Sequence, residues 1–69
     1  MDRTQVGSSN IASIGYESET ETLEVEFLAG SIYQYYDVPE YVYDELMSAS
    51  SHGGYLASNI RKNYAYTKL

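Results

Sequence analysis

The stretch Thr22-Leu-Glu-Val-Glu-Phe-Leu-Ala-Gly-Ser-Ile-Tyr-Gln-Tyr-Tyr-Asp-Val-Pro39 decides the fold, because it holds most of the apolar surface that this 69-residue chain can bury. Leu23, Val25 and Phe27 alternate with polar residues, which is the two-residue period of a strand with one face on the core. After Gly30, β-branched and aromatic residues resume the pattern. The stretch is therefore predicted to form a β-hairpin with a glycine in its turn.

The register of this hairpin decides where two tyrosines point. If the loop is Leu28-Ala29-Gly30, with a glycine bulge, Phe27 faces Ser31, and Tyr33 and Tyr35 lie on the core side. If the loop is only its last two residues, the second strand turns over and both rings stand on the open, acidic face. Alanine before the glycine favours the longer loop, and with it a structural role for the pair, but both registers remain possible from the sequence.

The residues before the hairpin are predicted to add one strand. Residues 1–9 lack periodicity and are expected to be a flexible N-terminal segment, followed by a single domain over 10–69. Ile11 to Tyr16 forms a short strand, and the polar residues 17–21 form the loop that leads into the hairpin. The result is a three-stranded antiparallel meander, which needs a cover on one face because three strands are marginal alone in water.

A helix over about Pro39 to Ser48 is predicted to supply that cover. Proline suits the first position of a helix, where its missing N–H costs nothing. Val42, Leu46 and Ala49 recur at the spacing of one apolar stripe, so this face is expected to lie on the sheet.

A second, shorter helix is expected to start at Ser50 or Ser51 and to run through Leu56 to Ile60. Gly53-Gly54 at its start suits close packing on the first helix better than phosphate binding, because no phosphate-loop motif follows a strand here. His52 lacks a partner for catalysis or metal binding and is predicted to be a surface or capping residue. The fold class is α+β, in the order βββαα.

Charge is distributed unevenly along the chain, whose net charge is −6. Residues 1–60 contain all ten acids and a single cation, Arg3, whereas Arg61, Lys62 and Lys68 lie in a segment without acids. The overall acidity disfavours a polyanionic partner for the body of the domain. The positive C-terminal segment is the exception.

Composition limits the functions that the chain can have. There is no cysteine, so neither disulfides nor thiolate chemistry is available, and no apolar run is long enough to span a membrane. A polar N-terminus is unlike a secretory signal, so a cytoplasmic location is expected. No nucleophile or acid–base pair stands out, and the three glutamates of 17–21 lack the glycine of a calcium loop. We therefore expect no enzymatic activity, metal, cofactor, small-molecule substrate or membrane partner.

The segment Asn59–Lys68 interleaves cations with aromatic residues. Such a strip can hold phosphates while its rings stack on unpaired bases, and Tyr64 and Tyr66 would share one side if it is extended. The alternative is that both rings pack on the sheet edge while the cations stay in water. The candidate nucleic-acid contacts are Asn59, Arg61, Lys62, Tyr64 and Tyr66, joined by Tyr33 and Tyr35 if the shorter hairpin loop forms.

From Ser9 to Lys68 the chain resembles the KTSC domain, a small family found alone in bacterial and phage proteins and at the C-terminus of some lysyl-tRNA synthetases. The residues that carry the resemblance are Ser9-Asn10-Ile11, Gly15-Tyr16, Leu23-Glu-Val-Glu-Phe27, Gly30, Tyr33-Gln-Tyr35, Val38-Pro39, Ser51-His-Gly53 with Tyr55, and Asn59-Ile60-Arg61 with Tyr64. One departure is Glu21, near a position that often carries glycine, which leaves the geometry of that turn open. The association with a tRNA synthetase implies RNA binding.

Two functions of different classes follow. The first is a small RNA-binding module that makes weak, salt-sensitive contacts through the C-terminal segment. The second is a protein–protein interaction module that uses an open sheet edge or a tyrosine-rich surface. The position of the positive residues relative to exposed tyrosine rings distinguishes them best.

Overall fold

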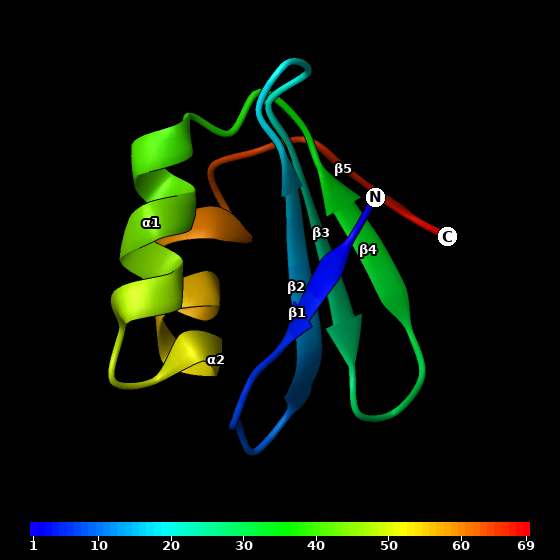
Figure 1. Cartoon of the computed structure of the whole chain (residues 1–69), viewed down its shortest axis with the longest axis vertical. Helices are drawn as coiled ribbons and strands as arrows, with labels where there is room; N and C mark the ends of the chain where they lie inside the picture. The colour runs from blue at the N-terminus through cyan, green and yellow to red at the C-terminus, as the bar shows by residue number, and fades with distance from the viewer.

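The computed structural model describes residues 1–69 and contains one five-stranded antiparallel sheet with helices on one side of it (Figure 1). The strands are β1 (Arg3–Gln5), β2 (Ile11–Glu17), β3 (Thr22–Phe27), β4 (Ile32–Tyr35) and β5 (Tyr66–Lys68). Their spatial order is also β1-β2-β3-β4-β5. The helical segments α1 (Glu40–Ser48), α2 (His52–Tyr55) and the π-helical turn η1 (Leu56–Ile60) lie between β4 and β5 in the chain.

The sheet has five strands where the sequence predicts three. Arg3–Gln5, within the segment expected to be flexible, pairs with β2 as β1, and Tyr66–Lys68 pairs with β4 as β5. All six residues of these two edge strands are exposed, so they carry no core periodicity. Backbone hydrogen bonding to an existing strand, rather than burial of side chains, places them in the sheet. The α+β class is confirmed, and the strand count is corrected.

The β3–β4 hairpin has the longer of the two loops considered. The Phe27 amide donates to the Ser31 carbonyl over 2.9 Å, and the Gly30 amide donates to the Phe27 carbonyl over 2.9 Å. Gly30 has a φ of 103°, the left-handed conformation that a glycine bulge requires. Tyr33 and Tyr35 therefore stand on the core face of the sheet, opposite Val25 and Leu23 in the register.

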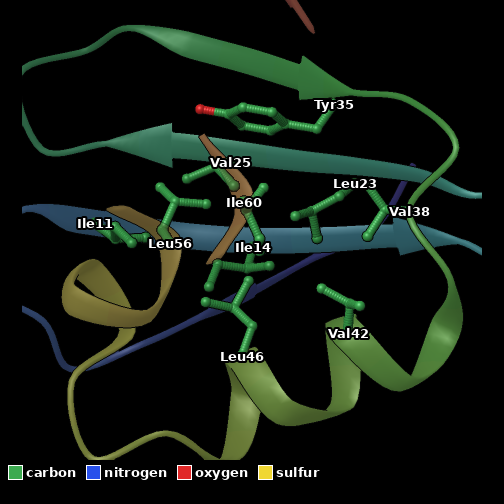
Figure 2. Packing of buried hydrophobic residues seen from close by; sticks show 10 residues of the cluster. All are labelled: Ile11, Ile14, Leu23, Val25, Tyr35, Val38, Val42, Leu46, Leu56 and Ile60. Atoms are coloured by element: carbon green, nitrogen blue, oxygen red, sulfur yellow. The ribbon is translucent and has the colours of Figure 1, made fainter. Parts of the chain in front are cut away.

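The core is a single cluster between this face and the helices (Figure 2). Helix α1 follows Pro39, as predicted, and places Val42 and Leu46 in the same buried cluster as the sheet residues Leu23 and Val25. The remaining buried apolar residues are Ile11, Ile14, Tyr35, Val38, Leu56 and Ile60. Phe27 differs from the other two alternating residues of β3, because it is only half-buried.

The second helical segment begins as expected and contacts both α1 and the β1–β2 loop. The Ser51 hydroxyl accepts from the Gly54 amide over 3.0 Å and caps α2. Nδ1–H of His52 donates to the Leu46 carbonyl over 2.9 Å, so this histidine caps the end of α1. Gly53 lies against the Asn10 side chain, which a Cβ at this position would strike. Gly53 therefore permits close contact with the β1–β2 loop, in addition to the predicted contact of α2 with α1.

Helix α2 continues directly into the wider helical turn η1. The Arg61 amide donates to the Leu56 carbonyl five residues earlier, over 3.0 Å, which defines η1 as π-helical. Leu56 and Ile60 are buried, so the two ends of this turn are fixed on the core. None of the helices is long and apolar enough to cross a bilayer.

Candidate functional site

A groove of about 1010 Å³ lies between η1 and the part of the sheet formed by β4 and β5. Its floor is aromatic and its rim at the end of η1 is positively charged. The lining residues are Phe27, Tyr33, Tyr35 and Tyr66 from the sheet, Ala57, Ser58, Arg61 and Lys62 from the helical side, and Ser9, Asn10, Leu28, Ala29 and Ser31 from the two loops at one end.

The groove exists because the core face of the sheet is wider than its helical cover. Tyr66 is opposite Tyr35 in the register, which puts both rings on the face that carries the core. Helix α1 lies closer to β2 than to β4 and β5, which are on the far side of the sheet from it (Figure 1). The side chains at the β4–β5 end of this face therefore line an open groove and do not pack beneath a helix.

Four aromatic rings form a continuous floor. The Tyr33 ring is at its centre, with centroids 5.6 Å from Phe27, 6.4 Å from Tyr35 and 5.6 Å from Tyr66. The Phe27 contact is edge-to-face, and the Tyr35 ring is stacked on Tyr33 at 19°. Tyr66 is 57% exposed and Tyr35 only 3%. Open ring surface is therefore concentrated at Tyr66, Tyr33 and Phe27.

The hydroxyl groups in the groove have unused hydrogen-bonding capacity. Tyr33, Tyr35 and Tyr66 make no hydrogen bond to the protein through their hydroxyls, whereas the Tyr16 hydroxyl donates to the Val38 carbonyl over 2.5 Å. No buried side-chain polar atom lacks a partner, so the groove hydroxyls reach its open space. Figure 2 shows the Tyr35 ring with its hydroxyl pointing away from Leu23 and Val38. These groups can donate to or accept from a bound molecule.

Arg61 lies close enough to the Tyr35 hydroxyl to influence its titration. Burial raises the pKa of Tyr35 above its ordinary value, and the positive charge of Arg61 opposes this rise. Ile60 is buried, and the Arg61 amide donates a hydrogen bond to the Leu56 carbonyl. These two contacts fix the backbone that carries this cation. The positive rim is therefore attached to a well-packed part of the domain.

The charges of the domain are segregated in space as well as in sequence. No acidic residue lines the groove. The only ion pairs join Arg3 to Glu24, at 3.0 Å, and to Glu26, at 3.9 Å. These two glutamates alternate with the core residues of β3 and so lie on the opposite face of the sheet. Arg61 and Lys62 are not neutralised by the carboxylates of the domain.

Five of the seven candidate contact residues come together in the groove, and they are Arg61, Lys62, Tyr66, Tyr33 and Tyr35. The shorter loop, on which the inclusion of Tyr33 and Tyr35 depended, does not form. The longer loop forms and directs them to the core face, yet that face is open at this end. Tyr35 is nevertheless too buried to offer its ring face to a ligand.

Asn59 and Tyr64 lie outside the groove. The Asn59 side chain donates to the Tyr55 carbonyl over 3.3 Å, which is a contact within the helical segment. Residues 61–64 turn and are not extended, so the condition under which Tyr64 and Tyr66 would share one side is not met. Tyr64 is half-buried, and its pKa is raised first by burial and then by the nearby Tyr41. Its surroundings are therefore the helical side of the domain.

Phe27 and Asn10 are lining residues that the sequence does not assign to a site. The alternation of β3 places Phe27 on the core face, but a two-residue period does not reveal where the helical cover ends. The Ser8 hydroxyl donates to Oδ1 of Asn10 over 3.1 Å, which orients the amide at the groove. No periodicity marks this loop residue.

Comparison with known proteins gives consistent results across the chain. A family model described as KTSC domain matches residues 7–64. A lysine–tRNA ligase of Trichormus variabilis is 43% identical over 61 residues, which are 88% of this chain and only 11% of the ligase. An uncharacterized protein of Stutzerimonas stutzeri is 36% identical over 70 residues and matches 100% of this chain and 99% of its own length. The crystal structure of a KTSC domain protein from Yersinia pestis has a TM-score of 0.93 and 38% identity, covering 99% of this chain and 96% of that chain.

Proposed function

This chain belongs to the KTSC domain family, and from this premise we propose that it is a small RNA-binding module whose contact surface is the groove between η1 and strands β4 and β5. Part of a lysine–tRNA ligase is similar to the chain, and the substrate in that name is an RNA. This similarity supports RNA as the class of partner. The choice of surface rests on the geometry of the groove.

The observation that carries the proposal is an unneutralised positive rim beside open aromatic rings. Arg61 and Lys62 make no ion pair within the chain, and Tyr66 is 57% exposed next to them. Cations hold phosphates, and exposed rings stack on bases, each stack contributing about 1–3 kcal/mol. The acidic residues lie outside the groove, so no carboxylate is in direct contact with a phosphate bound there.

The number of cations limits the strength of binding. Besides Arg61 and Lys62, the only cation on the core face of the sheet is Lys68, which is opposite Tyr33 in the register. Three phosphate contacts to a single strand give a slope of about −2 for the logarithm of the association constant against the logarithm of salt concentration. We expect a weak complex that is best measured at low salt.

Fluorescence anisotropy with a labelled single-stranded RNA and with a tRNA, at low salt, tests the proposal. The R61Q/K62Q variant should bind at least about tenfold more weakly, because it loses both rim cations. R61Q compared with R3Q is a matched pair, since each removes one positive charge but Arg3 lies beside Glu24 on the opposite face. R3Q should bind as the unchanged chain does.

Two results would defeat the proposal. One is the absence of binding by either RNA at tens of micromolar protein. The other is binding that is unchanged in R61Q/K62Q or reduced equally by R3Q, because that pattern would reflect net charge and not the groove.

A protein partner is the second candidate function. The sheet ends in two exposed three-residue strands, β1 and β5, each with one unpaired side. An extended segment of another protein can add to such an edge through main-chain hydrogen bonds. Light scattering that finds only monomer, together with a pull-down that retains nothing, would count against this candidate.

A further inference from the structure

We infer that the groove binds a short unpaired segment of about two nucleotides, with its phosphate at the Arg61–Lys62 rim and its bases on the Tyr66 and Phe27–Tyr33 surfaces. This inference rests on the proposed function and specifies its ligand. It follows from three properties of the groove, which are its stacking positions, its size and the position of its charge.

The stacking surface is limited to two places. Tyr35 is 3% exposed and is covered by its neighbours, so it offers a hydroxyl but no ring face. Tyr66 is open at one end of the floor, and Phe27 is partly exposed at the other, with the Tyr33 ring between them at 5.6 Å from each ring. One base can stack at each end of this row. A third base has no ring to meet.

The size of the groove agrees with this limit. Pockets that hold one small molecule measure about 300–1,000 Å³. The groove, at about 1010 Å³, is at the upper end of that range and is open on one side. It therefore has room for a ligand slightly larger than one nucleotide, but not for a long tract.

The position of charge indicates where the phosphate lies. Both lining cations directly follow η1, and the charge of Arg61 acts on the Tyr35 hydroxyl, whereas the loop end, with Ser9 and Asn10, is uncharged. A single phosphodiester can be held by the two cations and that hydroxyl. Oδ1 of Asn10 accepts from Ser8, which leaves its amide N–H groups free to donate to a base at the opposite end.

Double-stranded RNA is a poor match for this site. Its bases are stacked on one another and do not present their faces to protein rings. A second strand would also bring its phosphates toward a domain with ten acidic residues, none of which lies in the groove. The favoured targets are single-stranded ends and unpaired loop residues.

The test compares RNA hairpins that differ only in their 3′ end, by anisotropy at low salt with the full chain. We expect a two-nucleotide overhang to bind at least about tenfold more tightly than the blunt hairpin, on the scale of one or two stacked bases. Extending the overhang from two to six nucleotides should strengthen binding by less than about threefold, since the groove offers no further rings.

One variant and a matched control test the stacking position at Tyr66. Y66V removes the exposed ring but keeps a residue that favours a strand, and it should weaken binding of the two-nucleotide overhang by about tenfold. Y41A removes a ring that is 63% exposed on α1, outside the groove, and should leave binding unchanged. Circular dichroism confirms that each variant is folded before binding is compared.

Each remaining outcome counts against a specific claim. Equal binding of blunt and overhanging hairpins, if R61Q/K62Q weakens both, overturns the preference for unpaired bases but leaves RNA binding in place. Affinity that rises steadily to six nucleotides overturns the site size. Unchanged binding by Y66V overturns the stacking position. Failure of every RNA to bind removes the proposed function together with this inference.

Discussion

The turn between β2 and β3 contains a residue in an unfavourable backbone conformation, and replacing it should stabilise the domain. Glu21 is exposed and has a φ of 53°, in the left-handed region. Its carbonyl accepts from the Val38 amide over 2.9 Å, so the conformation is held by a contact between distant parts of the chain. Glycine adopts this region without a Cβ penalty. We predict that E21G is more stable than the unchanged chain.

The size of the effect is the difference between two terms. A non-glycine residue pays about 1–2 kcal/mol in the left-handed conformation. Glycine loses about 0.5–1 kcal/mol more conformational entropy on folding than alanine does. The difference between these two terms is about 0–1.5 kcal/mol, with a central value of about 0.75 kcal/mol. Since 1 kcal/mol shifts the melting temperature of a domain this size by about 4–8 °C, the central value corresponds to a rise of about 3–6 °C.

Thermal unfolding followed by circular dichroism measures this rise, and urea unfolding gives the free energy directly. The matched control is E21A, which removes the same charge near Glu17 and Glu19 but keeps a Cβ. The E21G and E21A variants therefore differ only in the conformational freedom of the backbone at this position. If E21G is no more stable than E21A, relief of the left-handed conformation is not the cause, and the reasoning is refuted.

Two further predictions concern the helical side of the domain. L46A should lower the free energy of unfolding, measured with urea, by about 2–5 kcal/mol, because Leu46 is fully buried. Tyr41 lies on the same helix but is 63% exposed, so Y41A should change this free energy by about 0.5 kcal/mol or less. A similar loss in both variants would show that α1 does not pack as described. Tyr55 donates to Glu45 over 2.6 Å, and this hydrogen bond, with smaller contributions from burial and nearby charges, raises its pKa to about 12. A group whose pKa is raised by folding stabilises the protein fully at pH values below its unfolded pKa, which is about 10 for Tyr55. This contribution is lost as the pH rises through the folded pKa of about 12. The stability advantage of the unchanged chain over Y55F should therefore disappear between about pH 10 and 12. An advantage that persists above about pH 12 in urea unfolding would contradict the assignment.

The hairpin and the first helix can be predicted because local chemistry determines them. Alanine before Gly30 favours the three-residue loop, and the hydrogen bond from the Phe27 amide to the Ser31 carbonyl shows that loop in the structure. Pro39 precedes the first residue of α1, as predicted, although β4 ends earlier, at Tyr35. In each case the residues that carry the signal are within a few positions of the feature that they specify.

The two edge strands cannot be predicted, because their signal is not local. Arg3–Gln5 and Tyr66–Lys68 are three residues long and fully exposed, so no periodic burial marks them. Each joins the sheet because its neighbour has an unpaired edge. The chain reaches the free edge of β4 to form β5 only after it has passed through the helical segments.

The groove is the feature furthest from what a sequence pattern can reveal, and its origin lies in the width of the layers. Strands are spaced about 4.8 Å apart, so five strands form a face of about 20 Å. One helix is about 10 Å across and covers roughly two strands. The nine residues of α1 lie closer to β2 than to β4 and β5 (Figure 1), and the short η1 adds Leu56 and Ile60 to the same buried cluster.

The β4–β5 end of the face is thus left without a helix, and tyrosine suits that position. Its ring packs on neighbouring rings while its hydroxyl reaches water. In a strand pattern, a tyrosine beneath a helix and a tyrosine in an open groove look the same, which is why the sequence alone favours a structural role for Tyr33. The distinction depends on where Arg61 and Lys62 emerge from η1, because only a charged rim beside those rings turns uncovered core face into a surface that can hold an anion.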